Sequence, residues 1–283
     1  MKIAVCLYGL AGGEVSSTSG IITVEPSRSY RNYMEVLFQG YDVDFFLHSW
    51  SVDSKDILLD LYKPKSSIIE NQIDFSGHSL EEYSLKHLET YKKIFATEEN
   101  IHSFLSERYI FNSHSRWYST SKSLEIMNDY SKDKNLHYDW VFQTRMDLFF
   151  RERLPFEKLN NNYFYTSPRF EMDSDLAIND VWFLSNQKNA ELFSKIYDNI
   201  FDYSIWTHSA AKQHVDSFGT SIEFYPEVSH GRKNYWLMRE VLIQEKAKKI
   251  PFFKRLVRFI LHRILGITSS FESLLKKIIL KLS

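Results

Sequence analysis

Short apolar runs alternate with longer amphipathic stretches along most of this 283-residue chain. The runs are rich in Val, Ile, Phe, Trp and Tyr, which favour strands, whereas the longer stretches repeat apolar residues at helical spacing. We therefore predict strands at residues 2–8, 41–48, 65–70, 138–147, 163–166, 181–184 and 222–225, and helices at residues 26–38, 112–130 and 187–201. Strand, helix and strand in succession form a βαβ unit, so the pattern predicts an α/β fold with a mostly parallel sheet.

The segment Tyr138–Phe150 carries the strongest functional signal. Its apolar first half predicts a buried strand, and Arg145 and Asp147 stand where this strand ends. In open α/β sheets, ligands bind at the carboxyl ends of the strands. Strand alternation sends the side chains of Arg145 and Asp147 to one face and that of Met146 to the other. We therefore expect a cation and a carboxylate together at the ligand-binding edge.

Two further pairs of residues are placed to join this edge. Tyr8 ends the first strand, and Gly9 follows it, where a glycine lets backbone N–H groups approach a phosphate. The spacing of the glycines matches neither the dinucleotide fingerprint nor the P-loop, so a simple turn is the alternative. Arg116 and Lys122 lie on the helix that precedes the strand ending in Arg145. For them the alternative to a ligand contact is a solvated helix face.

The charge of the chain is unevenly distributed. Although the net charge is −1, residues 246–283 hold ten Lys and Arg against a single acid, Glu272, so residues 1–245 are acidic. An acidic body argues against nucleic-acid binding, because neutralising phosphates needs a cationic surface. The single cysteine, Cys6, lies in an apolar run and fits a reducing compartment, and the first residues are too short for a signal-peptide core. These features predict a cytoplasmic protein.

The basic segment is expected to form a separate region. Its apolar and aromatic residues repeat at helical spacing opposite a face of Arg and Lys, which is typical of a helix lying in an anionic membrane interface. Neither of its two pieces reaches the roughly 20 apolar residues of a membrane span. We therefore predict a catalytic domain at residues 1–245 and a basic amphipathic helical tail at 246–283, with residues 250–282 on the membrane surface. A helical hairpin packed on the body or on a partner subunit is the alternative.

Five short motifs, taken in order, resemble those of a family of bacterial enzymes. They are Lys2–Gly9, Asp42–Trp50, Arg116–Lys122, Tyr138–Asp147 and Asn179–Phe183. Together they are similar to the motifs of glycosyltransferase-A enzymes that build bacterial surface polysaccharides, either capsule or lipopolysaccharide. The resemblance implies a Rossmann-like sandwich, in which helices flank a mostly parallel central sheet. It also implies a nucleotide-sugar donor and a glycan acceptor that is usually carried on a lipid.

In glycosyltransferase-A enzymes, a D-x-D motif after a central strand binds the donor diphosphate through a divalent metal. The matching residues here are Arg145, Met146 and Asp147, so arginine replaces the first carboxylate. Asp147 alone suits Mg²⁺ or Mn²⁺, since these hard cations keep several waters and take oxygens from substrate phosphates. The Arg145 guanidinium suits the diphosphate directly, because its forked donors match phosphate oxygens. Metal-assisted and metal-free departure of the nucleotide are both consistent with this motif.

The resemblance also assigns roles to three later residues. His230 and Lys233 lie in a segment that resembles, with altered spacing, a late motif of retaining glycosyltransferase-A families. In that motif a histidine completes the metal site and a lysine meets the diphosphate, so both residues are expected to contact donor phosphates. Asp180 opens an apolar strand, as the catalytic base does in similar enzymes, where a carboxylate takes the proton of the acceptor hydroxyl. A carboxylate that only caps a loop is the alternative.

The sequence thus predicts a glycosyltransferase that works at the inner face of the cell membrane. The expected donor-binding residues are Tyr8, Gly9, Arg116, Lys122, Arg145, Asp147, His230 and Lys233, and the expected catalytic residues are Asp180 and Asp147. Two other functions are consistent with these residues. One is a phosphoryl or modified-phosphate transferase, because an arginine and an aspartate suit any diphosphate leaving group. The other is a non-catalytic binding module at the membrane surface.

Overall fold

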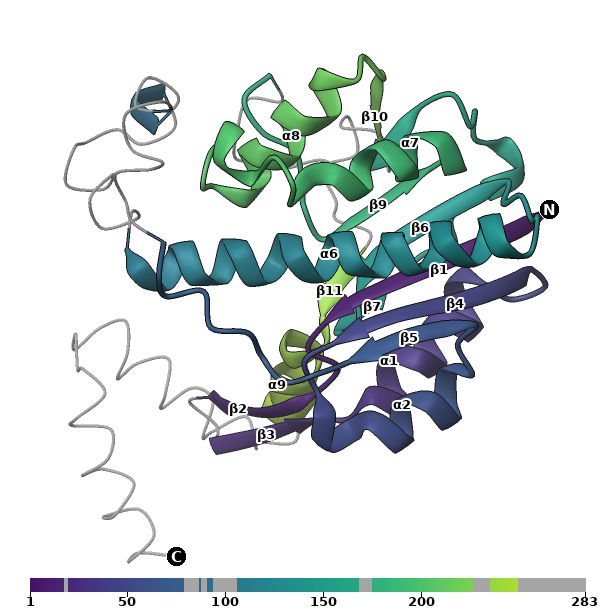
Figure 1. The fold of residues 1–283 in the computed structure, drawn as a ribbon. Helices are drawn as coiled ribbons and strands as arrows, with labels where there is room; N and C mark the ends of the chain where they lie inside the picture. The colour runs from purple at the N-terminus through teal and green to yellow at the C-terminus, as the bar shows by residue number, and fades with distance from the viewer. Residues whose placement is uncertain are drawn as a thin grey trace, which may run out of the picture. The chain divides into compact units, whose positions relative to one another are not determined.

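The computed structural model describes residues 1–17, 20–78, 87, 91–93, 106–167, 175–225 and 235–248. The chain divides into two compact units, one of residues 1–14 and 23–238 and the other of residues 15–22 and 239–283. The first unit holds a central sheet and the helices that cover it (Figure 1). The described residues of the second include most of helix α9 (Met238–Lys248).

The expected basic tail lies outside the described residues from 249 onward. Among the residues that are described, no helix is long and apolar enough to span a bilayer. A short two-stranded sheet, β2 (Gly13–Ser17) with β3 (Gly20–Val24), links the first strand of the central sheet to the first helix.

The central sheet has seven strands in the order β10-β8-β9-β6-β1-β4-β5. Their bounds are β1 (Lys2–Gly9), β4 (Asp42–Ser49), β5 (Ser66–Ile69), β6 (Trp140–Arg145), β8 (Phe164–Thr166), β9 (Trp182–Ser185) and β10 (Ile222–Phe224). Strand β9 runs antiparallel to both of its neighbours, and every other pairing in this sheet is parallel. The prediction of an α/β fold with a mostly parallel sheet is confirmed.

The order of the strands reverses between β1 and β6. From β1 the chain continues to β4 and then β5 on one side, and it later returns to β6 on the other. Tyr8 is paired in register with His48 of β4 and with Arg145 of β6, so the three carboxyl ends meet at one edge. A reversal of this kind opens a crevice in which ligands of α/β proteins bind.

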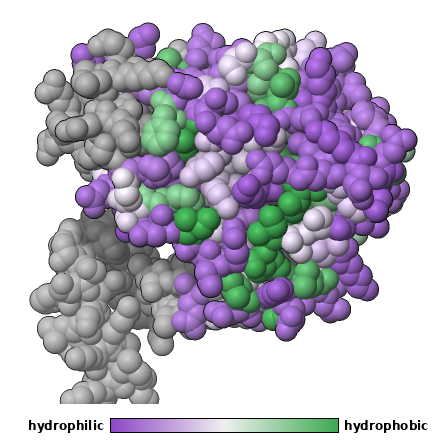
Figure 2. All heavy atoms as spheres, viewed as in Figure 1, coloured by the Kyte–Doolittle hydropathy of each residue, from purple (hydrophilic) through white to green (hydrophobic). Residues whose placement is uncertain are grey.

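Helices cover both faces of the sheet. Helix α1 (Pro26–Asn32), the π-helix Tyr33–Leu37 and α2 (Lys55–Tyr62) pack on the face that carries Ile3, Val5 and Leu7. Helices α6 (Glu107–Asp133), α7 (Gln187–Phe193) and α8 (Thr207–Ser217) pack on the face that carries Ala4 and Cys6. In Figure 1, α6 lies along the sheet beside β1 and β6. Figure 2, in the same view, shows a mostly hydrophilic surface with smaller hydrophobic groups.

Helix α6 is longer than predicted at its amino end. It begins at Glu107, and the side chain of Ser106 accepts a hydrogen bond from the Tyr109 N–H at 3.3 Å. Ser113 and Ser115, which are plausible caps by residue type, lie inside the helix instead. Trp117, Leu124 and Met127 form an apolar stripe at helical spacing and are almost completely buried. The stripe anchors the helix to the sheet and sets the positions of the polar residues beside it.

The segment after β6 turns back immediately. Met146 and Asp147 form a turn, and β7 (Leu148–Phe150) then pairs antiparallel with β11 (Tyr235–Leu237). The N–H of Met238 donates to the carbonyl of Asp147 at 2.7 Å. The turn is thus fixed from both ends, which places Asp147 beside the end of β6.

Candidate functional site

The charged end of β6 forms a partly exposed ion pair. Arg145 donates from Nε to Oδ1 and from Nη2 to Oδ2 of Asp147, both at 2.7 Å. The side chains are 35% and 19% exposed. Burial lowers the pKa of Arg145, but the carboxylate of Asp147 outweighs this effect and raises the pKa above its usual value. Such a two-pronged pair is geometrically well defined, and its guanidinium stays charged at any pH of interest.

The turn that carries this pair is held by Tyr33. Its hydroxyl donates to the carbonyl of Arg145 and accepts from the N–H of Leu148 at 3.1 Å. The strand predicted to reach residue 147 ends at Arg145, and Met146 in the turn is buried in the core with α1 and α2. The backbone on both sides of Asp147 is therefore rigid, and Arg145 is the longer and more exposed member of the pair.

Both carboxylate oxygens of Asp147 are bound by the guanidinium of Arg145. A cation at Asp147 would compete with Arg145 for the same oxygens. The more exposed member of the pair is the guanidinium, which donates hydrogen bonds and so suits an anion.

A second carboxylate, Asp180, is buried near the same edge. It lies two residues before β9, and because β9 is antiparallel, this lead-in lies beside the carboxyl end of β6. Its Oδ2 is 3.6 Å from Nε of Arg116, and its Oδ1 is 3.2 Å from Nδ1 of His208. Burial raises the pKa of the Asp180 carboxyl, but His208 and Arg116 outweigh it and bring the pKa down to about 2. The side chain is therefore a charged anchor.

Arg116 belongs to the framework of the site. Its guanidinium lies 4.2 Å from the centre of the Tyr8 ring and 4.4 Å from that of Trp117. It donates to the carbonyl of Asp180 and to the hydroxyl of Thr120. With a side chain 12% exposed, Arg116 is placed to fix Asp180 and offers little surface to a ligand.

Tyr8 connects the two ion pairs. Its hydroxyl is 3.2 Å from the carbonyls of both Asp180 and Val181, which anchors the lead-in of β9 to the end of β1. Burial raises the pKa of the Tyr8 phenol, and charges from Arg116, Asp180 and the Arg145 pair act on it as well. The phenol therefore lies within electrostatic reach of both pairs, although its ring is buried.

His208 is the residue of this site that the sequence analysis missed. It lies in the first turn of α8, a helix that was not predicted, and its Nδ1 faces Asp180. A signal was present, since Ala210, Ala211, His214 and Val215 repeat at helical spacing and are buried together. Small residues make a weak apolar stripe, which explains why the sequence pattern did not predict this helix. Its contact with Asp180 depends on tertiary structure alone.

Gly9 takes part in a hydrogen-bonded chain that runs away from the ion pairs. Its N–H donates to the Ser119 hydroxyl at 2.9 Å, and that hydroxyl is 2.7 Å from Nδ1 of His48. Nε2 of His48 lies 3.1 Å from Oε1 of Glu70. The N–H of Gly9 is therefore engaged within the protein. Gly12 is required by packing, because a side chain there would meet the carbonyl of Val24.

The remaining predicted residues lie elsewhere. Lys122 binds Glu125 at 2.8 Å and lies 5.5 Å from the centre of the Tyr118 ring, near His48 rather than near Arg145. His230 and Lys233 lie outside the described residues. Of the eight expected donor-binding residues, the structure thus brings Tyr8, Arg116, Arg145 and Asp147 to one electrostatic cluster with Asp180, as the charges acting on Tyr8 indicate.

The two ends of the segment between β8 and β9 are tied together. The hydroxyl of Thr166, the last residue of β8, donates to the carbonyl of Asn179 at 2.7 Å and lies 3.1 Å from that of Trp182. The side-chain amide of Asn179 donates to the Tyr235 hydroxyl at 2.8 Å. These bonds fix the backbone on both sides of Asp180.

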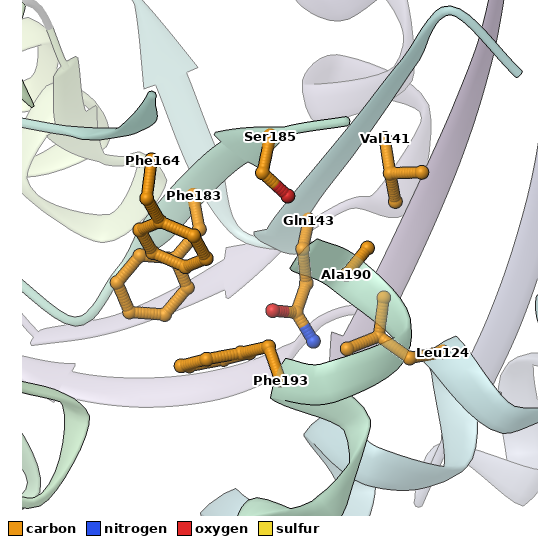
Figure 3. A pocket seen from close by; sticks show the side chains of 8 residues that line it. All are labelled: Leu124, Val141, Gln143, Phe164, Phe183, Ser185, Ala190 and Phe193. Atoms are coloured by element: carbon orange, nitrogen blue, oxygen red, sulfur yellow. The ribbon is translucent and has the colours of Figure 1, made fainter. Parts of the chain in front are cut away.

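A cavity of about 10 Å³ lies beneath the sheet, away from these ion pairs. Figure 3 shows the amide of Gln143 beside the aromatic rings that line it; its lining residues are Leu124, Val141, Gln143, Phe164, Phe183, Ser185, Ala190 and Phe193. A cavity of this size holds about one water at most, so it is part of the core and not a ligand site.

An α/β sheet with charged pairs at its strand-order reversal is the class of arrangement that the structure defines. Searches against models of known protein families and against curated proteins give no match to the chain. The function has to be argued from the resemblance of the motifs and from the site itself.

Proposed function

We propose that the chain is a transferase that binds a nucleoside diphosphate group at the carboxyl edge of β1 and β6. The observation that carries this proposal is the position of the Arg145–Asp147 pair, partly exposed at the point where the strand order reverses. Within that class, the sequence motifs favour a glycosyltransferase. Its donor is a nucleotide sugar, and its acceptor is a bacterial surface glycan carried on a lipid.

Arg145 is assigned the diphosphate of the donor. Two of its guanidinium nitrogens hold Asp147, and the side chain is 35% exposed, so we assign its remaining N–H groups to the incoming anion. As the bond between the sugar and the diphosphate breaks, negative charge grows on the phosphate oxygens, and a fixed guanidinium stabilises it. Asp147 keeps the guanidinium in place. In this assignment Arg145 takes the role that a divalent metal has in the resembling enzymes.

Asp180 is assigned a positioning role. The sequence suggests a catalytic base at this position, but a carboxylate with a pKa of about 2 accepts a proton poorly near neutral pH. Its charge instead orients Arg116 and His208, and through the backbone it joins β1 to β9. The acceptor side of the site is therefore built around Asp180.

The first test is a screen for donors. Thermal stabilisation and turnover are measured with UDP, GDP, CDP and CMP and with the corresponding nucleotide sugars, each with Mn²⁺ and with EDTA. We expect one nucleotide to stabilise the protein, its sugar derivative to be turned over, and both effects to persist in EDTA. A strict need for Mn²⁺ would indicate that a metal at Asp147, and not Arg145, binds the diphosphate. The absence of any effect with all donors would contradict the proposed function.

The second test concerns Arg145 itself. Arg145→Lys keeps the charge but loses the fork, and Lys does not replace Arg at two-pronged sites. We expect nucleotide affinity to fall about tenfold or more, since a hydrogen bond to a charged group contributes roughly 1.5–3 kcal/mol. Arg153→Lys is the matched control, because Arg153 pairs with Tyr41 on the surface and is not part of the site. Equal affinity of the Arg145→Lys variant and the control would contradict the assignment.

We also propose attachment to the inner face of the membrane through residues 250–282, which rests on the sequence pattern alone. Flotation with anionic and with neutral vesicles, for the full chain and for a chain lacking residues 246–283, tests this. The full chain is expected to float with anionic vesicles only. Equal recovery of both chains with anionic vesicles would contradict membrane attachment.

A further inference from the structure

The two-stranded ribbon of β7 and β11 has one face in the core and one outside it (Figure 1). Phe150 lies opposite Tyr235, and both of these rings are buried. Phe149 lies opposite Trp236, and both of these side chains are half-buried. Because directly opposite residues of an antiparallel pair share a face, Phe149 and Trp236 project together from the outer face. Neither belongs to the two core clusters that the described residues form.

This outer face continues directly from the Arg145–Asp147 pair. Burial alternates along the segment, so that Asp147, Phe149 and Arg151 are partly or fully exposed, whereas the residues between them are buried. Such alternation places the three side chains in one row. At about 3.4 Å per residue, the row from Asp147 to Arg151 is about 14 Å long at most. It is therefore long enough for a short oligosaccharide that begins beside Asp147.

Arg151 gives the aromatic pair a polar edge. Its guanidinium lies 5.4 Å from the centre of the Trp236 ring, and the side chain is exposed. Contact with the ring face uses none of the five N–H donors of a guanidinium, so these donors suit hydroxyl or carboxylate oxygens. Ligand sites combine aromatic surface with a few polar groups that fix the orientation of the ligand. A sugar ring matches this combination, because its C–H face is apolar and its rim carries hydroxyl groups.

Strand β11 also adjoins the acceptor side of the site. The hydroxyl of Tyr235, the neighbour of Trp236, accepts a hydrogen bond from the side-chain amide of Asn179 at 2.8 Å. Asn179 directly precedes Asp180, around which the acceptor side is built. The ribbon thus joins the segment of Asp180 through β11 and the donor pair through β7.

We propose that Phe149, Trp236 and Arg151 form an aromatic platform that binds a sugar ring of the acceptor glycan; the assignment to the acceptor rests on the proposed glycosyl transfer. The ring stacks on Phe149 and Trp236, and Arg151 donates to its hydroxyl or carboxylate oxygens. The sugar that receives the new bond lies next to Asp147, one step along the row. The acceptor is therefore a glycan of more than one sugar unit.

The test is glycan binding by the full chain, measured on an array of oligosaccharides from bacterial capsules and lipopolysaccharides. The deciding variant is Trp236→Leu, which keeps an apolar side chain but loses the flat ring. We expect the affinity for the bound glycans to fall about tenfold or more, since Trp side chains are typical of positions that carry most of the binding energy. Trp236→Phe is expected to recover part of this loss. Phe201→Ala, which removes a 39% exposed ring outside the ribbon, is the control and should bind as the wild type does.

The nucleotide found in the donor screen is expected to stabilise Trp236→Leu as much as the wild type, which shows that the variant is folded and that its donor side is intact. A folded Trp236→Leu variant that no longer responds to the nucleotide would assign the ring to the donor and overturn the platform. Equal glycan affinity of Trp236→Leu and the wild type, or no glycan bound by the wild type, would overturn it as well. So would weaker flotation of Trp236→Leu with anionic vesicles at unchanged glycan binding, because the ring would then contact lipid.

These outcomes leave turnover of a nucleotide sugar by the wild type standing. The opposite result separates the two proposals from the other side. If glycan binding depends on Trp236 but the wild type turns over no nucleotide sugar, the platform stands as a sugar-binding site and the proposed transferase fails.

Discussion

Two histidines near the carboxyl edge of the sheet each face a carboxylate, but through different ring nitrogens. Nε2 of His48 lies 3.1 Å from Oε1 of Glu70, and its Nδ1 lies 2.7 Å from the Ser119 hydroxyl. Nδ1 of His208 lies 3.2 Å from Oδ1 of Asp180 and 3.0 Å from the carbonyl oxygen of Ile178.

The two histidines also differ in how far they and their carboxylates are buried. The ring of His48 is fully buried, and both of its nitrogens are engaged between α6 and the strands it joins. Its carboxylate partner, Glu70, is 37% exposed, whereas Asp180, the partner of His208, is 10% exposed. In the His48 pair only the carboxylate is exposed, whereas both members of the His208 pair are largely buried.

Removing the charge of Asp180 is expected to be the most costly change. Asp180→Asn leaves Arg116 buried without its counter-charge, and breaking a buried ion pair costs about 3–5 kcal/mol. We expect the free energy of unfolding, measured by urea titration, to fall by about this amount. A loss no greater than that of Asp198→Asn, which removes one side of a half-exposed pair with Lys195, would show that Asp180 is not an anchor.

The buried histidines and Asp180 are expected to lose their contributions to the free energy of unfolding at different pH. Burial lowers the pKa of His48 and brings those of His114 and His214 from 6.5 to about 4. The unfolded chain then binds more protons than the folded one between pH 6.5 and 4, so stability falls as the pH falls through this window. Each pKa unit corresponds to about 1.4 kcal/mol.

The contribution of Asp180 follows a lower window. Its pKa is depressed from 3.8 to about 2, so the stability it adds is complete above pH 3.8 and is lost only as the pH falls toward 2. Unfolding free energies measured across both windows are expected to show two separate losses. In Asp180→Asn only the lower-pH loss should disappear. A stability that does not change between pH 6.5 and 4 would contradict the burial of these histidines.

Ser119 is the link through which His48 supports Gly9. Ser119→Ala leaves the Gly9 N–H and His48 Nδ1 without their hydrogen-bond partner, and an unsatisfied buried polar group costs about 1–3 kcal/mol. We expect a loss in this range by urea titration. Ser115→Ala on the same helix, whose hydroxyl makes an exposed bond to Gln72, is the control and should cost much less.

Glu70→Gln is expected to have the smallest effect. Its side-chain oxygen still accepts from Nε2–H of His48, and pairs near the surface contribute less than about 1 kcal/mol. The free energy of unfolding is again measured by urea titration. The difference between the losses in Asp180→Asn and in Glu70→Gln measures how much more the buried carboxylate contributes. If the two variants lose equal stability, the distinction between a hidden and a solvent-facing carboxylate is wrong.

Most strands of the sheet could be predicted from the sequence, because each is a local apolar run. Trp140, Val141 and Phe142 are buried on both faces of β6, which is what a continuous run of strand-forming residues predicts. The direction of β9 could not be predicted, since Trp182, Phe183 and Leu184 form the same pattern in a parallel or an antiparallel strand. The amino end of α6 was misplaced because several serines compete as caps and only the tertiary structure selects Ser106.

The residues of the site were predicted only where they lie next to a strand with a clear apolar pattern. Arg145 and Asp147 follow the clearest strand, so both their position and their mutual orientation could be expected. Asp180 was found, but its pKa depends on Arg116 and His208, which reach it through tertiary packing. No local pattern around Asp180 indicates these two neighbours, so its depressed pKa could not be predicted from the sequence.

Thr166 has a consequence for how this scaffold can be altered. Its hydroxyl ties the end of β8 to the carbonyls of Asn179 and Trp182, which lie on either side of Asp180. Closing a longer loop costs only about 0.6 kcal/mol for each doubling of its length. Insertions between Thr166 and Asn179 are therefore expected to leave Asp180 in place. For the transferase proposed above, exchange of this segment would change the acceptor side while the donor side stays constant.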